Sequence, residues 1–386
     1  MQKLFITLSL TGIGYGATLA YTYFVLAYAT DESISRLNQY ESVLTIIASL
    51  ISLGVVQDAS RNITLNAKEW RSIYCDAQGL RLSLAILISI GSLLAYMATK
   101  SELYLLGLAS FSMALSGEYA LYALGRPVEG SLASLIRALL FSAIIILFSI
   151  YKGTDFNSIT ITIAWSLGFF ACGLFASKKL DVTYLLMPRS TQIKTLKTIG
   201  LLALLIFIYN NLKPSFILMI SDKISLKENA YYFEAYKIYF ILFSVRRVVV
   251  QALYKEIITS PKSLKYDFIV SCVMAVALVG LWFARTIIDM ASIKFPGLSY
   301  QILIDISIIT AMSCILPTSF TRLFSLKKDL LIVIPVLCAS ALLFVGIKTL
   351  SLQGASVSSY LYLLGAAELV ISLTSFLILK RKLATT

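Results

Sequence analysis

The sequence contains no histidine, and charged residues occupy only 14% of its 386 positions. Histidine is the commonest general base and the commonest metal ligand, so its absence excludes histidine-dependent catalysis. Five cysteines are present without any paired spacing: Cys75, Cys172, Cys272, Cys314 and Cys338. A disulfide framework and a zinc site are therefore not indicated. We expect no metal and no other cofactor.

Long polar segments are also missing. Hydrophobic residues make up 58% of the chain and the mean hydropathy is +0.84, whereas soluble domains are roughly 45–50% apolar. The apolar residues fall in runs of about twenty, the length that a helix needs to cross a membrane. We predict an all-α polytopic membrane protein with twelve spans: 4–28, 42–57, 80–98, 103–123, 131–151, 158–177, 198–220, 233–254, 267–288, 300–321, 329–348 and 356–379.

The positive charges predict the orientation of the chain. Of the 33 Lys and Arg residues, twenty fall in the loops of one side, eight in the loops of the other side and five inside spans. Loops rich in Lys and Arg stay in the cytoplasm, so both termini are predicted to be cytoplasmic. The net charge of +13 is then a topology signal and an attraction to anionic membrane lipids, and nucleic acid is not expected as a partner.

The two halves of the chain resemble each other weakly. A shift of 193 residues lays 39–41 on 232–234 and the first span on the seventh, although shared helix lengths alone would also mimic a repeat. Both spans start in the cytoplasm, which predicts two six-helix bundles related by a parallel pseudo-twofold repeat. The bundles would cover 1–180 and 198–386, with a basic cytoplasmic linker at 181–197. Such bundles leave a cleft for alternating access.

Cations inside spans are costly and therefore suggest function. In the eighth span Lys237, Ser244, Arg247 and Gln251 share one helical stripe, and Arg246 lies roughly 100° away. A stripe of this kind that lines a wet cleft would suit a diphosphate, for which the arginine fork is well shaped. Alternatively, the arginines snorkel to the interface or pair with Glu234 or another acid.

Two further spans carry unusual polar residues. Pro214 in the seventh span would direct Asn210, Asn211 and Lys213 towards the cleft. The alternative is an interhelical hydrogen-bond node in which Lys213 reaches a carboxylate. Arg137 in the fifth span is either an anion ligand or the partner of an acid, Glu118, in the fourth span.

Three carboxyl groups inside spans are candidates for coupling transport to an ion gradient. Glu368 lies at the centre of the twelfth span, Asp305 lies in the tenth span towards the periplasm, and Glu118 lies near the cytoplasmic end of the fourth. Buried carboxyl groups can take up and release protons, as such coupling requires. A purely structural role remains the alternative for each of them.

Several segments carry a resemblance to a known family: residues 53–61, Arg126-Pro127, 133–137, 210–213 and 230–238. Together with the twelve spans in two halves, they resemble the Wzx-type O-antigen and polysaccharide flippases, members of the multidrug, oligosaccharidyl-lipid and polysaccharide exporter (MOP) superfamily with a MATE-like fold. The sequence departs from the family pattern in its second span, which has no Lys or Arg before Arg61.

The resemblance implies that the chain moves an undecaprenyl-diphosphate-linked oligosaccharide from the cytoplasmic to the periplasmic leaflet of a bacterial inner membrane. It also implies H⁺ or Na⁺ coupling, and a polysaccharide polymerase and a chain-length regulator as protein partners. The cavity cations of the family would correspond to Arg247 and Lys237, then to Lys213 and Arg137.

Two other functions stay open. A multidrug exporter would share the fold, but its cavity should favour acids and aromatic rings for cationic drugs, whereas the candidate cavity here is basic. An O-antigen polymerase or membrane glycosyltransferase usually carries a long periplasmic loop with catalytic residues, and no outer loop here exceeds about fifteen residues on the same span assignment. We therefore expect a transporter that is not an enzyme.

Overall fold

The computed structural model is helical throughout the parts of the chain that it describes, and no strand occurs there. Those parts are residues 2–152, 156–182, 190–220, 223–260, 263–290, 299–323 and 330–384. Each of the twelve predicted spans overlaps helical residues. The predicted all-α class is therefore confirmed.

Seven of the helices within these ranges are long and apolar enough to cross a membrane. The number rises to eight if α2 and α3, which are bent by 47° at a short break, form one span. The exact number of twelve spans stays a prediction. The seven candidate spans are Trp70–Thr99, Pro127–Tyr151, Ser158–Leu180, Lys265–Ile287, Tyr300–Leu323, Leu331–Leu352 and Val357–Lys382.

The chain forms two compact units, and neither is a continuous segment. Unit 1 comprises Met1–Tyr21 and Arg36–Ile217, and unit 2 comprises Thr22–Ser35 and Leu218–Thr386. The turn between the first two helices therefore groups with unit 2. The predicted division into halves around a linker at 181–197 stays a prediction, and residues 183–189 of that linker lie outside the described ranges.

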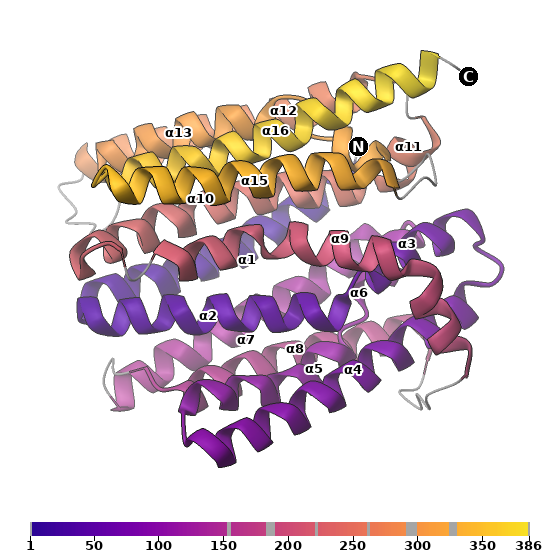
Figure 1. Ribbon diagram of the computed structural model, residues 1–386, viewed down its shortest axis with the longest axis horizontal. Coiled ribbons are helices and arrows are strands. Elements are labelled where there is room, and N and C mark those ends of the chain that lie inside the picture. Colours follow the sequence, from indigo (N-terminus) through magenta and orange to yellow (C-terminus); the bar gives the residue numbers. More distant parts are fainter. Residues whose placement is uncertain are drawn as a thin grey trace. The chain divides into compact units, whose positions relative to one another are not determined.

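Unit 1 holds all or most of each N-terminal helix, and Figure 1 shows these helices in indigo to crimson. They are α1 (Gln2–Tyr28), α2 (Asp31–Ser52), α3 (Val55–Leu65), α4 (Trp70–Thr99), η1 (Glu102–Ala109), α5 (Ser110–Leu115), α6 (Glu118–Ala123), α7 (Pro127–Lys152), α8 (Ser158–Leu180) and α9 (Ser190–Ile220). The helix α7 packs along α8, and α9 continues through Pro214 as one helix.

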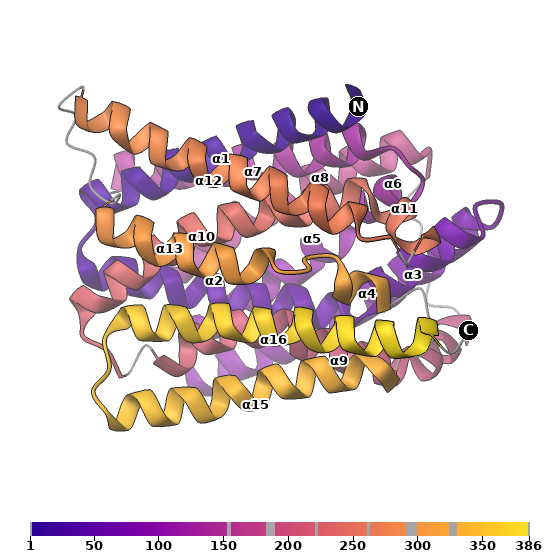
Figure 2. The same cartoon turned by 90° about the horizontal axis from the view of Figure 1, so that it is seen from above.

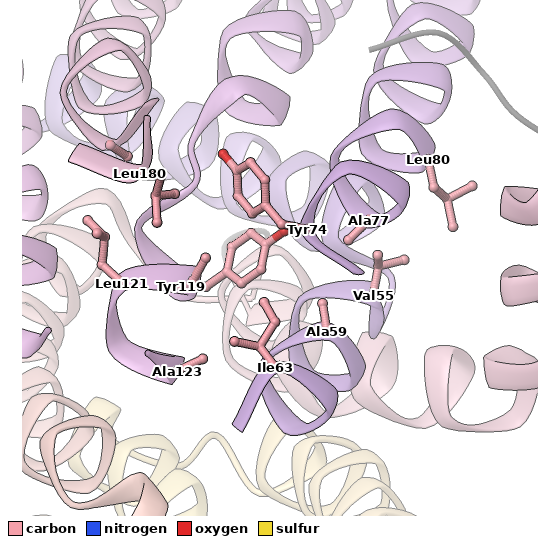
Figure 3. Close-up of a cluster of buried hydrophobic side chains, with 12 residues drawn as sticks. Val55, Ala59, Ile63, Tyr74, Ala77, Leu80, Tyr119, Leu121, Ala123 and Leu180 are labelled. Carbon is pink, nitrogen blue, oxygen red and sulfur yellow. The ribbon is translucent and has the colours of Figure 1, made fainter. Parts of the chain in front are cut away.

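The predicted fourth span, 103–123, is broken in unit 1. It consists of the 3₁₀ helix η1 and the short helices α5 and α6, with Ser116 and Gly117 between the last two. A Cβ atom at Gly117 would lie 2.2 Å from the hydroxyl of Tyr74, so only glycine lets the backbone pass at this distance. Figure 3 shows the buried cluster that holds α6 against α3 and α4. Within this cluster the ring centres of Tyr74 and Tyr119 lie 5.8 Å apart.

Unit 2 holds the C-terminal helices. They are α10 (Leu226–Ala252), α11 (Tyr254–Thr259), α12 (Lys265–Met290), α13 (Tyr300–Cys314), α14 (Ser319–Leu323), α15 (Leu330–Leu352) and α16 (Val357–Ala384). The helices α15 and α16 run side by side, as Figure 2 shows, and α16 also packs on α13. The helix α10 contacts α12, α13 and α16.

The predicted tenth span, 300–321, is also broken. It divides into α13 and α14, which are separated by residues 315–318. Proline disfavours the helical conformation of the residue before it, and Leu316, which precedes Pro317, has a φ of 52°. Both units therefore contain a broken span, and the breaks at Ser116–Gly117 and at 315–318 expose carbonyl groups that need hydrogen-bond donors.

Candidate functional site

The helix α10 carries most of the predicted site residues, and a capping box sets its start. The hydroxyl of Ser225 accepts the backbone N–H of Glu228, and the Glu228 carboxylate accepts the backbone N–H of Ser225 at 2.8 Å. These hydrogen bonds hold the pKa of Glu228 below its usual range. Within the helix, successive side chains are turned by about 100°, so the neighbours Arg246 and Arg247 point in different directions.

Arg246 points into unit 2 and is fully engaged there. Its guanidinium donates to the carbonyl groups of Ser313 and Pro317 at 3.1 Å each, which are carbonyls at the break between α13 and α14. It also pairs with Glu368 of α16 at 3.3 Å, and the two side chains are only 7% and 5% exposed. The predicted alternative in which Arg246 pairs with an acid is therefore realised. Its role as a diphosphate ligand and the coupling role of Glu368 stay predictions that these contacts do not support.

Arg247 is exposed on the other face of α10. No ion pair or hydrogen bond of its side chain is found with the described residues. Its predicted stripe is not uniform, because Lys237 and Ser244 are buried and Gln251 is half-buried. The ammonium of Lys237 lies 5.1 Å from the ring centre of Phe233, in a cation–π contact. Arg247 is thus the member of the stripe that a soluble or lipid-borne anion can reach.

In unit 1, Arg137 of α7 pairs with Glu118 at the start of α6, at 2.9 Å. The thiol of Cys172 donates to the second oxygen of Glu118 at 3.6 Å, and the guanidinium lies 4.7 Å from the ring centre of Phe169. The Arg137 and Glu118 side chains are 33% and 17% exposed, so this pair is partly open. The sequence left the pairing as one of two alternatives, and the structure brings the two residues together.

The helix α9 places Asn211 against α2. Its side-chain amide donates to the hydroxyl of Ser49 at 2.9 Å and to the carbonyl of Phe207 at 2.6 Å. This contact agrees with the alternative of an interhelical hydrogen-bond node. Asn210 is half-buried, and the side chain of Lys213 lies outside the described residues. Their predicted cavity roles stay predictions.

Asp305 of α13 is fully buried and is surrounded by uncharged donors. It accepts hydrogen bonds from Gln301 of its own helix at 3.0 Å and from Tyr231 of α10 at 2.9 Å. Ser358 and Tyr362 of α16 donate to it at 2.7 and 2.6 Å. Asp305 thereby links three helices of unit 2. Its coupling role stays a prediction, because both carboxylate oxygens already have two donors each.

Sequence reasoning missed two buried arginines, which it counted as loop cations. Arg81 of α4 donates to the carbonyl groups of Met113 and Ser116 at the end of α5, and its guanidinium lies 5.7 Å from the ring centre of Tyr119. Arg81 satisfies the open carbonyls of the broken span in unit 1, as Arg246 does in unit 2. The signal was weak, since Arg81 stands at the very start of an apolar run.

The second missed arginine is Arg322 of α14. It pairs with Asp267 of α12, and its Nε donates to the hydroxyl of Thr318 at 2.9 Å. The same carboxylate accepts the backbone N–H of Thr318 at 2.9 Å. Asp267 and Arg322 therefore hold the start of α14 from both sides. No group of three His, Cys, Asp or Glu side chains suited to a metal occurs in the described part of the chain.

Comparison with known proteins identifies the fold. No known protein family and no curated protein matches the sequence. Solved structures do match, among them a MATE transporter in the straight conformation, with a TM-score of 0.70 and 14% identity over 100% of this chain and 95% of that one. An outward-facing multidrug resistance MATE transporter of the MOP superfamily matches with a TM-score of 0.67 and 15% identity over 99% and 96%.

A third similar structure is a MOP superfamily transporter from Pyrococcus furiosus, described as having a binding pocket of reverse polarity that suggests a different function. It matches with a TM-score of 0.62 and 14% identity over 99% of this chain and 95% of that one. This chain is therefore a multi-pass membrane protein with the transporter fold of these structures.

Proposed function

We propose that this chain, which shares the fold of the MATE transporters, is a flippase for an undecaprenyl-diphosphate-linked oligosaccharide. It would move this lipid from the cytoplasmic to the periplasmic leaflet of a bacterial inner membrane by ion-coupled alternating access, with both of its own termini in the cytoplasm. The observation that carries the proposal is the exposed side chain of Arg247 within the long helix α10, where no acid among the described residues neutralises it.

The physical argument starts from the cost of a charge inside a membrane. An arginine at the centre of a membrane helix costs about 2.5–3.5 kcal/mol or more, and one nearer the end of a helix can reduce this cost by reaching towards the interface. Arg247 lies five residues before the end of α10 at Ala252 and has no acid partner among the described residues, so its charge needs another source of stabilisation. A guanidinium offers parallel N–H donors that match two phosphate oxygens, and it stays charged at any physiological pH. A diphosphate on a lipid carrier supplies the complementary charge at the correct depth. Arg247 therefore serves as the diphosphate ligand.

A second cation, Arg137 in unit 1, supports this function. The Arg137 side chain keeps a third of its surface exposed although it pairs with Glu118. An anion that approaches Arg137 competes with Glu118, and a carboxylate that loses its cation binds a proton more readily. Glu118 is thus the carboxyl group whose surroundings favour ion coupling, more than those of Glu368 and Asp305, which are enclosed.

The test is transport by the full chain in proteoliposomes. We expect Arg247→Gln to lower the flipping rate of a radiolabelled undecaprenyl-diphosphate-linked oligosaccharide at least about tenfold, and Arg247→Lys to retain part of it. Lys265→Gln, which removes an exposed cation at the start of α12, is the matched control and should transport at the wild-type rate. Wild-type flipping by Arg247→Gln would remove Arg247 from the site.

A multidrug exporter is the second candidate, because solved structures of this fold include multidrug transporters. The same fold also occurs in the transporter whose pocket polarity is described as reversed, so the fold alone does not choose the substrate. An exporter of cationic drugs would be hindered by an exposed arginine and helped by its removal. Efflux of ethidium that increases in Arg247→Gln, without any flipping of the lipid, would favour the exporter.

A further inference from the structure

A row of aromatic rings follows the same helix that carries Arg247. Tyr232 and Tyr236 are stacked, with ring centres 5.9 Å apart and ring planes 11° from parallel. Phe240 continues the row, with its ring centre 6.2 Å from that of Tyr236. The rings recur every four residues, so they lie along one face of α10. Tyr232 is buried, Tyr236 is half-buried and Phe240 is 40% exposed. The row therefore runs from the interior of unit 2 to its surface.

The exposed end of this row shares its face with Arg247. By helical geometry Tyr236, Phe240, Phe243 and Arg247 fall within about 60° of the helix circumference. We call these four residues the α10 strip. Phe240 and Arg247 are seven residues apart, which corresponds to about 10 Å along the helix axis. The guanidinium of Arg246 lies 5.2 Å from the ring centre of Phe243 and supports that ring from the buried side.

The α10 strip differs from the exposed faces of α12 and α15 in the same unit, which have the uncharged composition expected of a surface in contact with lipid. Between Phe268 and Phe283 every exposed residue of α12 is uncharged, and so is every exposed residue of α15 from Ile334 to Val345. Both of these helices are apolar enough to span a membrane, whereas α10 is not among the seven helices that are. Lipid tails would suit aromatic rings alone, but they do not suit rings interleaved with an exposed arginine. The α10 strip therefore suits a ligand with both a flat apolar face and a negative charge.

We propose that the α10 strip binds the sugar that is attached directly to the diphosphate. The diphosphate pairs with Arg247, and one face of the sugar ring, which is lined by C–H groups, packs on Phe240 and Tyr236. This assignment rests on the proposed function and refines it, because it places the glycan beside the charge instead of leaving it in bulk water. A free glycan without a diphosphate would bind weakly, since it lacks the charged contact.

The test compares two soluble probes on the purified full chain in detergent, by titration calorimetry. One probe is farnesyl diphosphate, and the other is farnesyl diphosphate that carries one N-acetylglucosamine. We expect the sugar to tighten binding to the wild type about three- to tenfold. Phe240→Leu should abolish that gain without changing the affinity for bare farnesyl diphosphate, and Tyr236→Leu should do the same.

The control is Phe283→Leu, which removes an exposed ring of α12 and should keep the full gain. Arg247→Gln should weaken both probes alike. Equal losses for both probes in Phe240→Leu, or no loss, would overturn the sugar contact. If Arg247→Gln binds both probes as the wild type does, the diphosphate assignment fails separately. A loss of tetraphenylphosphonium binding in Phe240→Leu, with the sugar gain intact, would show instead that the rings serve a cationic ligand.

Discussion

Each of the two units contains an ion pair between an arginine and a glutamate of its helices, and the two pairs differ in how far they are buried. In unit 2 the pair Arg246–Glu368 is enclosed, and its two side chains are 7% and 5% exposed. In unit 1 the pair Arg137–Glu118 has a shorter N–O distance, 2.9 Å against 3.3 Å, yet its side chains are 33% and 17% exposed. The N–O distance alone therefore does not show how accessible an ion pair is to a competing ion.

Enclosure decides the role of each pair. Breaking a buried pair leaves a charge without compensation, so the Arg246–Glu368 pair resists exchange of its partners and stabilises the packing of α10 on α16. A partly open pair can admit a competing ion at much smaller cost. The pair of unit 2 therefore stabilises the fold, whereas the pair of unit 1 can exchange its carboxylate for a competing anion.

The largest effect is expected when the enclosed pair is cut. Arg246→Met should destabilise the protein by about 3–5 kcal/mol, because Glu368 is then buried without its cation and the carbonyls at the break lose their donor. The double variant Arg246→Met with Glu368→Met should recover a large part of this loss. Thermal unfolding in detergent measures both. If Arg246→Met were as stable as the wild type, the stabilising role of the Arg246–Glu368 pair would be refuted.

Asp305 provides the next test, since it is a buried carboxylate held by neutral donors. Asp305→Ala should cost roughly 2–4 kcal/mol, because four hydrogen bonds are lost and the half-buried donors of α10 and α16 lose their acceptor. Asp305→Asn should cost less, since the hydroxyl groups can rotate to accept from the amide. The same unfolding assay applies, and equal losses for the two variants would show that packing, not hydrogen bonding, dominates here.

Cutting the open pair should cost much less. Arg137→Met is expected to destabilise the chain by only about 1 kcal/mol, since both side chains keep part of their surface exposed. Transport should be affected more strongly than stability, because the exchange with Glu118 is lost. The paired readouts are the unfolding temperature and proton-dependent flipping in proteoliposomes. If Arg137→Met were as destabilising as Arg246→Met, the distinction between the two units would fail.

The smallest effect concerns Glu228, an acid in the exposed first turn of α10. Its pKa is lowered in the folded state by the hydrogen bonds from Ser225. The stabilisation is therefore complete above the usual glutamate pKa and is lost as the pH falls through the lowered value. Ser225→Ala should cost about 0.5 kcal/mol at pH 7, the low end for the loss of an N-cap, because this helix start is exposed. In Glu228→Gln the remaining stability should change less between pH 6 and pH 3 than in the wild type, as unfolding curves at several pH values would reveal.

Much of the architecture could be predicted because it is local. Runs of about twenty apolar residues predict helices, and every predicted span overlaps helical structure. The breaks were missed, although Gly117 and Pro317 mark them, because either residue also occurs inside continuous membrane helices. The pairing of Arg137 with Glu118 could be proposed, since the residues lie on neighbouring helices only 19 positions apart.

The sequence by itself determined that the chain is helical, that it suits a membrane, and that Arg246 and Arg247 must point in different directions, because helical periodicity follows from the backbone alone. It did not determine which of the two arginines would be buried. That was decided by Glu368, 122 residues away from Arg246, and by carbonyl groups at a helix break. A side chain's direction is a local property, whereas its partners arrive from distant segments, and only the tertiary structure brings them together.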